Sequence, residues 1–248
     1  MPGFEVLVFA PLIVGAAYVI FGMVGFGSVL IATPLLAHLF PIKFVLPLIV
    51  ILDCIGSFGM GTRLRASVNR RELVPLLPFM LAGMVAGIFL LVRLPAGALL
   101  ACLGVFALVY GAIYALKRDA ALRLARWSAA PLGLVAGTSS TVLGVGGPIY
   151  VMYLAGRGST PDQIRATMPV IFMFTTITRI ALYATAGLFS RDVLLTAAAL
   201  LPVMALGIYL GHRLQLRLPR DTVVRVIGVL VMASGVSLLL RAWSQAGT

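Results

Sequence analysis

Two apolar stretches of this chain are interrupted by glycine and hydroxyl residues, a combination that could bind a small anion. The clusters are GMVGFGS at residues 22–28 and TSSTVLGVGGP at residues 138–148. Glycine destabilises a helix interior and permits non-helical backbone, so each cluster predicts a helix that stops and restarts. A restarting helix presents free N–H groups and the positive end of its dipole, which attract anions.

The residues expected to form the anion site offer backbone amides, hydroxyl groups or a positive charge. They are Gly25, Gly27, Ser28, Ser139, Ser140, Thr141, Gly146, Gly147 and Arg179. The hydroxyl run also has a structural interpretation, in which its side chains bond back to helix carbonyls or ease helix packing. Both interpretations remain open from the sequence.

Arg179 and Asp53 are charged residues in the middle of apolar segments. Such residues are costly in a membrane and are functional candidates. Asp53 corresponds in position to Thr175, one helical turn before Arg179. We therefore expect an ion pair between Asp53 and Arg179 that either holds two helices together or opens as a gate when an anion competes for the arginine.

Other chemistries have little support in the sequence. The two cysteines, Cys54 and Cys102, lie in apolar segments, and no spacing typical of a metal site or a catalytic nucleophile is present. No cofactor is expected, and the protein is not expected to be an enzyme. The net charge of +12 indicates basic loops or an anion-attracting field, whereas no basic tail suggests nucleic-acid binding. His38, Glu5 and Glu72 are expected near the membrane interface.

The composition predicts an all-α bundle of transmembrane helices, because 61% of the 248 residues are hydrophobic and only 10% are charged. Eight apolar regions cover residues 4–40, 44–61, 73–92, 96–116, 127–154, 167–188, 193–212 and 222–243. Six have about the length of a spanning helix. The first and fifth are longer, and these two contain the glycine clusters.

The two halves of the chain repeat. Gly25 and Gly27 match Gly144 and Gly146 at an offset of 119, and prolines and glycines farther along match at offsets of 122 and 124. These matches predict a first repeat over residues 1–116, a basic cytoplasmic linker over 117–126 and a second repeat over 127–248.

The distribution of basic residues predicts that the repeats are inverted. The loop at 63–71 has four arginines and its counterpart at 188–192 has one, and the other three pairs of loops also reverse the bias. Cytoplasmic loops carry the excess of Lys and Arg. Inverted repeats require an odd number of membrane crossings in each half, but each half has four apolar regions. We therefore expect the interrupted region of each half to enter the membrane and return, which gives five segments in each half and ten in total. The second arm of the fifth region is short and could be a half-helix.

The two glycine clusters, with Pro34-Leu35 and the duplicated layout, resemble the sulfite exporter TauE/SafE family. The first cluster departs from the family's run of glycines at Phe26 and Ser28. The resemblance implies a multi-pass secondary transporter of the bacterial inner membrane that moves sulfite, sulfoacetate or related organosulfonates. We expect it to export them by alternating access of the two repeats. The partners implied by the resemblance are a small anionic substrate and the lipid bilayer. The sequence does not indicate an oligomeric state.

Two other functions stay open from the residues. One is a proton-coupled carrier of another small solute, which would need a buried carboxylate such as Asp53. The other is an intramembrane enzyme acting on a lipid phosphate, for which no acid or base lies near the hydroxyl cluster.

Overall fold

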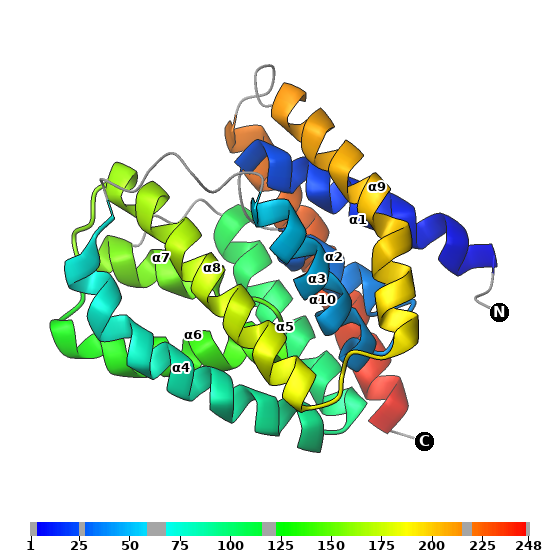
Figure 1. The fold of residues 1–248 in the computed structure, drawn as a ribbon, viewed down its shortest axis with the longest axis horizontal. Helices are drawn as coiled ribbons and strands as arrows, with labels where there is room; N and C mark the ends of the chain where they lie inside the picture. Colours follow the sequence, from blue (N-terminus) through cyan, green and yellow to red (C-terminus); the bar gives the residue numbers. More distant parts are fainter. Residues whose placement is uncertain (1–3, 25–27, 59–67, 116–122, 215–219, 247–248) are drawn as a thin grey trace. The chain divides into compact units, whose positions relative to one another are not determined.

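The computed structural model describes residues 4–24, 28–58, 68–115, 123–214 and 220–246 (Figure 1). Its regular elements are helices throughout these ranges. The α-helices are α1 (Phe4–Val24), α2 (Ser28–Leu36), α3 (Ile42–Phe58), α4 (Arg70–Arg93), α5 (Ala96–Ala115), α6 (Ala129–Val142), α7 (Gly147–Gly156), α8 (Pro161–Thr185), α9 (Arg191–Leu214) and α10 (Arg220–Ala246).

The fifth apolar region is interrupted where its glycines lie, whereas Gly25 and Gly27 of the first region lie outside the described residues. Helix α1 ends at Val24 and α2 begins at Ser28, while α6 ends at Val142 and α7 begins at Gly147. Gly144 has φ +77°, a left-handed conformation that suits glycine, and Pro148 stands in the first turn of α7. Helix α7 has 10 residues, so it is about 15 Å long, half of a hydrocarbon core of about 30 Å.

The helices form two compact units. Unit 1 comprises residues 1–56, 94–118 and 189–248, and unit 2 comprises residues 57–93 and 119–188. In unit 1, α5 packs along α10 and α1 packs along α9. In unit 2, α4 packs along α6, and α7 and α8 complete the bundle. Each unit therefore combines segments of both predicted repeats, so the compact units cut across the division expected from the sequence.

Glycines allow the close packing of α4 on α6. A methyl group built on Gly83 would overlap the Leu134 carbonyl, and one on Gly87 would lie 3.0 Å from the Thr138 carbonyl oxygen. The hydroxyl of Thr138 donates to the Gly83 carbonyl at 3.0 Å. Small residues at such contacts let helix backbones approach closely.

The same packing occurs between α9 and α1 in unit 1. A methyl group on Gly207 would lie 2.8 Å from the Gly15 carbonyl oxygen, and one on Gly211 would overlap the Val19 carbonyl. Gly207 and Gly211 follow Gly83 and Gly87 by 124 positions, and Gly15 and Val19 precede Leu134 and Thr138 by 119. The α4–α6 pair and the α9–α1 pair are therefore packed through residues that correspond in the two halves of the sequence.

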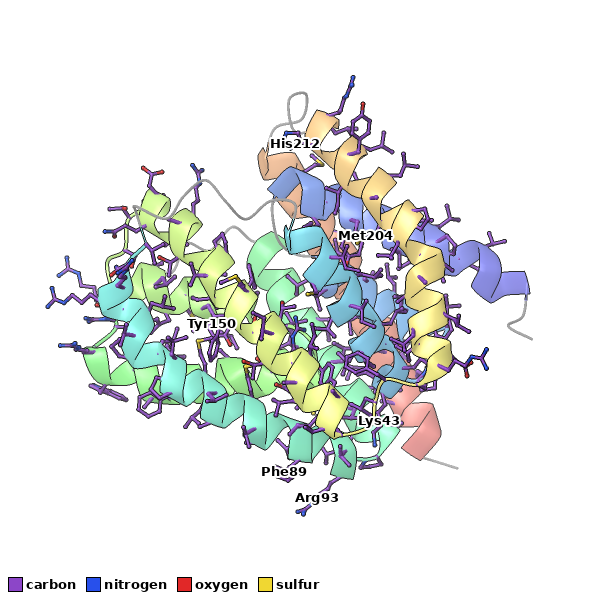
Figure 2. The ribbon with its side chains drawn as sticks, viewed as in Figure 1. Lys43, Phe89, Arg93, Tyr150, Met204 and His212 are labelled. Carbon is purple, nitrogen blue, oxygen red and sulfur yellow. The ribbon has the colours of Figure 1, made fainter. Side chains whose placement is uncertain are left out.

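Three described helices are long and apolar enough to cross a membrane, namely Arg70–Arg93, Pro161–Thr185 and Arg191–Leu214. Shorter apolar stretches occur at Val8–Met23, Ala96–Val109 and Val231–Trp243. Large apolar side chains are exposed on these helices, including Phe89 on α4, which points away from the bundle (Figure 2). Exposed apolar faces of this kind suit contact with lipid.

Candidate functional site

The interruption between α6 and α7, residues 143–146, is lined by buried polar groups of unit 2. Ser139, Ser140 and Thr141 form the last turn of α6 and are all buried. Ser139 donates to the Ala136 carbonyl at 3.1 Å, and Thr141 donates to the Gly137 carbonyl at 3.3 Å. These two hydroxyls adopt the back-bonded arrangement of the structural interpretation and would have to rotate to donate to an anion.

Arg179 directs its guanidinium at this interruption. Its side chain comes from α8 and is only 4% exposed. The Nη1 atom donates a long hydrogen bond of 3.4 Å to the Gly144 carbonyl, and Nε has no hydrogen-bond partner among the described residues. Among the described residues of unit 2, no carboxylate forms an ion pair with Arg179. The guanidinium is thus buried with donor capacity to spare.

Two tyrosines that the sequence analysis did not select also border the interruption. Tyr183 is buried and donates a 2.7 Å hydrogen bond to the Thr141 carbonyl. The hydroxyl of Tyr150, labelled in Figure 2, is buried and has no hydrogen-bond partner in the described ranges. Both phenols are within electrostatic reach of Arg179. The spacing of four between Arg179 and Tyr183 is the signal that could have identified Tyr183.

The glycines at the start of α7 are tightly packed. A methyl group on Gly146 would lie 2.8 Å from the Ala136 carbonyl oxygen, 2.9 Å from the Tyr150 ring and 3.0 Å from the Ser140 Cβ. A methyl group on Gly147 would lie 3.2 Å from the Phe172 ring. These contacts bring the N-terminus of α7 against α6, so the structure gathers Ser140, Gly146 and Tyr150 in one place.

Unit 1 has its own polar centre at the start of α2. Asp53 of α3 is 6% exposed, and its Oδ1 accepts hydrogen bonds from the Tyr18 hydroxyl at 2.7 Å and the Ser28 hydroxyl at 3.0 Å. Gly25 and Gly27 lie outside the described residues. The centre of unit 1 thus contains a carboxylate, whereas that of unit 2 contains a guanidinium.

Each member of the predicted pair has contacts inside its own unit. Asp53 binds Tyr18 and Ser28 in unit 1, and Arg179 binds the Gly144 carbonyl in unit 2. The ion pair between Asp53 and Arg179 stays a prediction.

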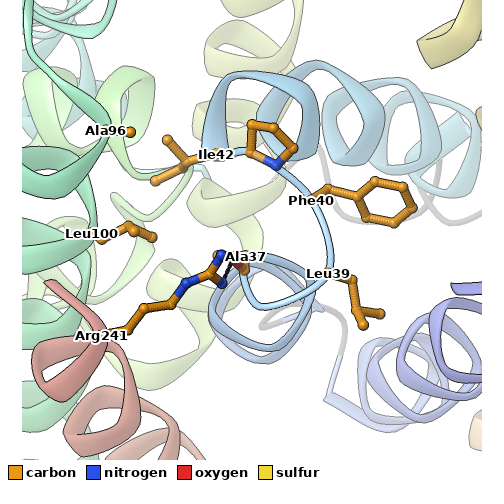
Figure 3. A pocket seen from close by; sticks show the side chains of 8 residues that line it. Ala37, Leu39, Phe40, Ile42, Ala96, Leu100 and Arg241 are labelled. Carbon is orange, nitrogen blue, oxygen red and sulfur yellow. Dashed lines mark hydrogen bonds between the residues drawn. The ribbon is translucent and has the colours of Figure 1, made fainter. Parts of the chain in front are cut away.

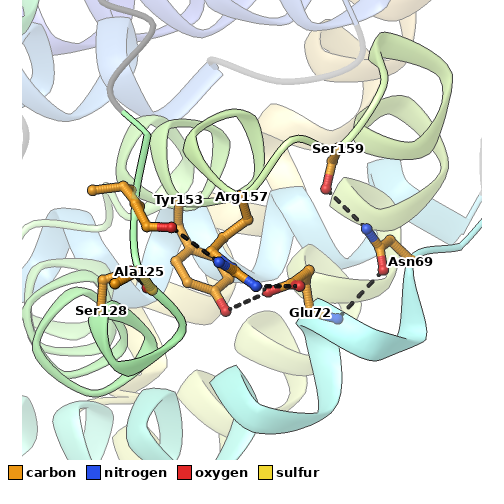
Figure 4. Close-up of polar contacts among 8 residues, drawn as sticks. Asn69, Glu72, Ala125, Ser128, Tyr153, Arg157 and Ser159 are labelled. Carbon is orange, nitrogen blue, oxygen red and sulfur yellow. Dashed lines mark hydrogen bonds and ion pairs between the residues drawn. The ribbon is translucent and has the colours of Figure 1, made fainter.

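A second polar cluster joins the end of α7 to the start of α4 in unit 2 (Figure 4). Arg157 donates from Nε to Glu72 Oε2 at 2.8 Å and from Nη2 to Glu72 Oε1 at 3.0 Å, and Tyr153 donates to Oε2 at 3.0 Å. Arg157 also donates to the Leu124 carbonyl at 2.9 Å. Hydrogen bonding to Glu72 raises the pKa of Arg157 above its ordinary value. Glu72, expected only to lie near the interface, is a buried member of a bidentate pair that holds α7.

A pocket of about 210 Å³ lies in unit 1 at the C-terminal end of α2 (Figure 3). Its lining is mainly apolar, with Phe40, Ile42 and Leu100 on its walls. Arg241 of α10 donates from Nη1 to the carbonyls of Ala37 at 2.8 Å and His38 at 3.1 Å. The arginine thus binds carbonyl groups at the C-terminal end of α2, where a positive charge is favourable.

Comparisons with known proteins identify relatives of this chain. The family model described as sulfite exporter TauE/SafE matches residues 10–238. A protein of Comamonas testosteroni described as probable inner membrane transporter protein TsaS is 30% identical over 199 residues, which cover 79% of this chain and 83% of the relative. No solved structure matches the chain significantly. Since the family model covers most of the sequence, the chain belongs to the sulfite exporter TauE/SafE family of membrane transporters.

Proposed function

We propose that the protein is a secondary transporter of the bacterial inner membrane that exports small sulfur-containing anions such as sulfite, sulfoacetate or related organosulfonates. The family description supports the class of anion, and the name of the Comamonas testosteroni relative supports the membrane. The observation that carries the proposal is the guanidinium of Arg179, buried at the interruption between α6 and α7 with Nε unbonded among the described residues.

A buried arginine that pairs with no carboxylate among the described residues of its unit needs negative charge from elsewhere. An isolated charge is expensive in a low-dielectric interior, and a planar guanidinium matches the oxygen atoms of a sulfonate or sulfite. The hydroxyl of Tyr150 and the N-terminus of α7 lie beside it and add donors without formal charge. An anion bound here would neutralise Arg179 and use the spare donors.

The proposed architecture is two inverted repeats with ten membrane segments, in which α2 and α7 are half-helices. The loop charges and the repeated packing of α4 on α6 and of α9 on α1 support it. Gly25, Gly27 and Ser28 would contribute the part of the anion site that belongs to the first repeat. Alternating access would then come from movement of one compact unit against the other, rather than of one sequence repeat against the other.

Flux measurements in proteoliposomes test this function. Radiolabelled sulfite, sulfoacetate and thiosulfate would be offered at imposed potentials of either sign. Arg179→Ala should lower the initial rate by about thirtyfold or more, as expected when one member of a buried charged contact is removed. The matched control Arg165→Ala, on the same helix but 60% exposed, should stay within about twofold of wild type.

The stability of the variants separates function from folding. If Arg179 is only structural, Arg179→Ala loses folded protein along with transport. A folded, monodisperse Arg179→Ala protein with wild-type anion flux would contradict the proposed site, and a wild-type protein that moves none of the three anions would contradict the proposed function.

A further inference from the structure

The Glu72 carboxylate binds the end of α7 that lies away from the proposed anion site. Glu72 is 4% exposed, although it stands in the first turn of an otherwise apolar helix. It accepts two hydrogen bonds from Arg157 and one from Tyr153. Replacing a buried ion pair by apolar residues is often neutral or stabilising, so stability alone does not explain a carboxylate at this position.

Arg157 ties the end of α7 to two other parts of unit 2. Its Nη1 donates to the Leu124 carbonyl at 2.9 Å, and the Leu124 N–H donates to the Gly156 carbonyl at 2.8 Å. These bonds join α7 to the segment before α6, and the pair with Glu72 joins it to the start of α4. A guanidinium bound to both oxygens of a carboxylate has a fixed orientation as well as a fixed distance. The contacts therefore set the direction of α7 within unit 2.

The position of Glu72 is itself fixed by Asn69, which precedes α4 (Figure 4). The Asn69 Oδ1 accepts from the Glu72 N–H at 3.3 Å, and its Nδ2 donates to the Ser159 hydroxyl at 2.9 Å. The Asn69 N–H donates to the Thr167 hydroxyl oxygen on α8 at 3.0 Å. The first turn of α4 is thus held independently of Arg157, so a change at Glu72 should act on α7.

Helix α7 depends on such contacts because it has only 10 residues. Helices shorter than about 12–15 residues are marginal on their own. Tyr150, Tyr153 and Arg157 follow one another at spacings of three and four, so they share one face of the helix. About 10 Å of helix separates Arg157 from Tyr150. A tilt of α7 at its anchored end would therefore move the Tyr150 hydroxyl relative to Arg179.

We propose that Glu72 is a positioning residue of the anion site, which acts through Arg157 by fixing the half-helix α7. The pair sets where the Tyr150 hydroxyl and the first turn of α7 stand relative to the Arg179 guanidinium. This inference rests on the proposed function and adds to it a residue that does not itself touch the anion. Breaking the pair should weaken anion binding in protein that remains folded.

The charge of Glu72 gives this test a sign. Loss of a negative charge would by itself strengthen the binding of an anion, because like charges repel. Positioning predicts the opposite. Glu72→Gln should raise the Kd of labelled sulfite or sulfoacetate about tenfold in equilibrium binding, because a displaced hydroxyl forfeits its hydrogen bond to a charged group.

Two further variants separate geometry from charge. Arg157→Lys keeps the positive charge but loses the planar fork that binds both carboxylate oxygens, so it should also raise the Kd about tenfold. Arg71→Gln is the matched control, because it changes an exposed charge at the start of the same helix. It should leave the Kd within about twofold of the wild-type value.

A double variant tests the route through Tyr150. If Glu72 acts by placing the Tyr150 hydroxyl, Glu72→Gln and Tyr150→Phe remove the same contact with the anion. Combined, they should raise the Kd by less than the product of the two single effects, as is usual for residues that act as a unit. An increase equal to the full product would overturn the proposal.

Thermal unfolding and size-exclusion chromatography distinguish positioning from folding. Wild-type or tighter binding by folded Glu72→Gln protein overturns the proposal even if its unfolding temperature falls, since Glu72 would then be only structural. If Glu72→Gln does not fold, the same conclusion follows from wild-type binding by folded Arg157→Lys protein. Intact wild-type binding that neither variant alters overturns the positioning alone, whereas a wild-type protein that binds no anion contradicts the proposed function.

Discussion

The hydroxyl of Tyr183 donates a 2.7 Å hydrogen bond to the carbonyl of Thr141, and both residues are fully buried. The bond joins α8 to the last turn of α6, immediately before the interruption. Tyr183 follows Arg179 by four residues, so both side chains leave α8 on the same face. The hydrogen bond therefore helps to hold the guanidinium against Gly144.

Tyr183→Phe should destabilise the protein and weaken anion binding together. The change leaves the buried Thr141 carbonyl without its donor, at a cost of about 1–3 kcal/mol. Because the helix that carries Arg179 is then less firmly held, the apparent KM for the transported anion should rise. Thermal unfolding in detergent and the concentration dependence of flux measure the two effects. A lower unfolding temperature with an unchanged KM would show that the bond does not position Arg179.

Tyr150→Phe should weaken anion binding without lowering the stability of the protein. The Tyr150 hydroxyl has no hydrogen-bond partner among the described residues, so its removal leaves no protein group unsatisfied and should not lower the unfolding temperature. If the hydroxyl donates to the bound anion, the apparent affinity should fall by about tenfold or more, the usual effect of losing a hydrogen bond to a charged group. Equilibrium binding of labelled sulfite or sulfoacetate would measure this loss, and wild-type affinity in Tyr150→Phe would exclude the hydroxyl from the site.

The local pattern of the sequence predicts where the helices stop. Gly144 and Gly146 lie between the end of α6 and the start of α7, whereas Gly25 and Gly27 lie outside the described residues. The cause of this break is local, since glycine lowers the stability of a helix interior wherever it occurs. The fifth apolar region therefore forms two helices, α6 and α7.

Features that depend on distant residues were not predictable in the same way. Glu72 stands at the start of an apolar helix and so looks interfacial, but its partner Arg157 is 85 residues away. Tyr150 is one of several aromatic residues in apolar segments, and its buried hydroxyl and the approach of its ring to Gly146 distinguish it only once the chain is folded. The combination of α4 with α6 to α8 in one compact unit likewise results from tertiary packing, which repeat offsets do not encode.

His38 should make the stability depend on pH. Burial and the nearby Arg241 guanidinium lower the pKa of His38 from its ordinary value of 6.5. As the pH falls below about 6.5, the unfolded chain takes up a proton that the folded protein resists, so the free energy of unfolding decreases until the pH reaches the lower folded pKa. Unfolding temperatures at about pH 7.5 and about pH 5.5 should differ less in His38→Gln than in wild type. Equal differences would show that other groups cause the acid sensitivity.

Gly146→Ala should disrupt the start of α7 and with it the anion site. The added methyl group would lie 2.8 Å from the Ala136 carbonyl oxygen and 2.9 Å from the Tyr150 ring, so either the helix or the ring must move. Overpacking of this kind costs about 1–3 kcal/mol. We expect lower anion flux per folded protein and a lower unfolding temperature. Gly97→Ala is the matched control, because no atom lies within 4 Å of its added methyl group. Wild-type flux in Gly146→Ala would mean that transport does not need the close approach of α7 to α6.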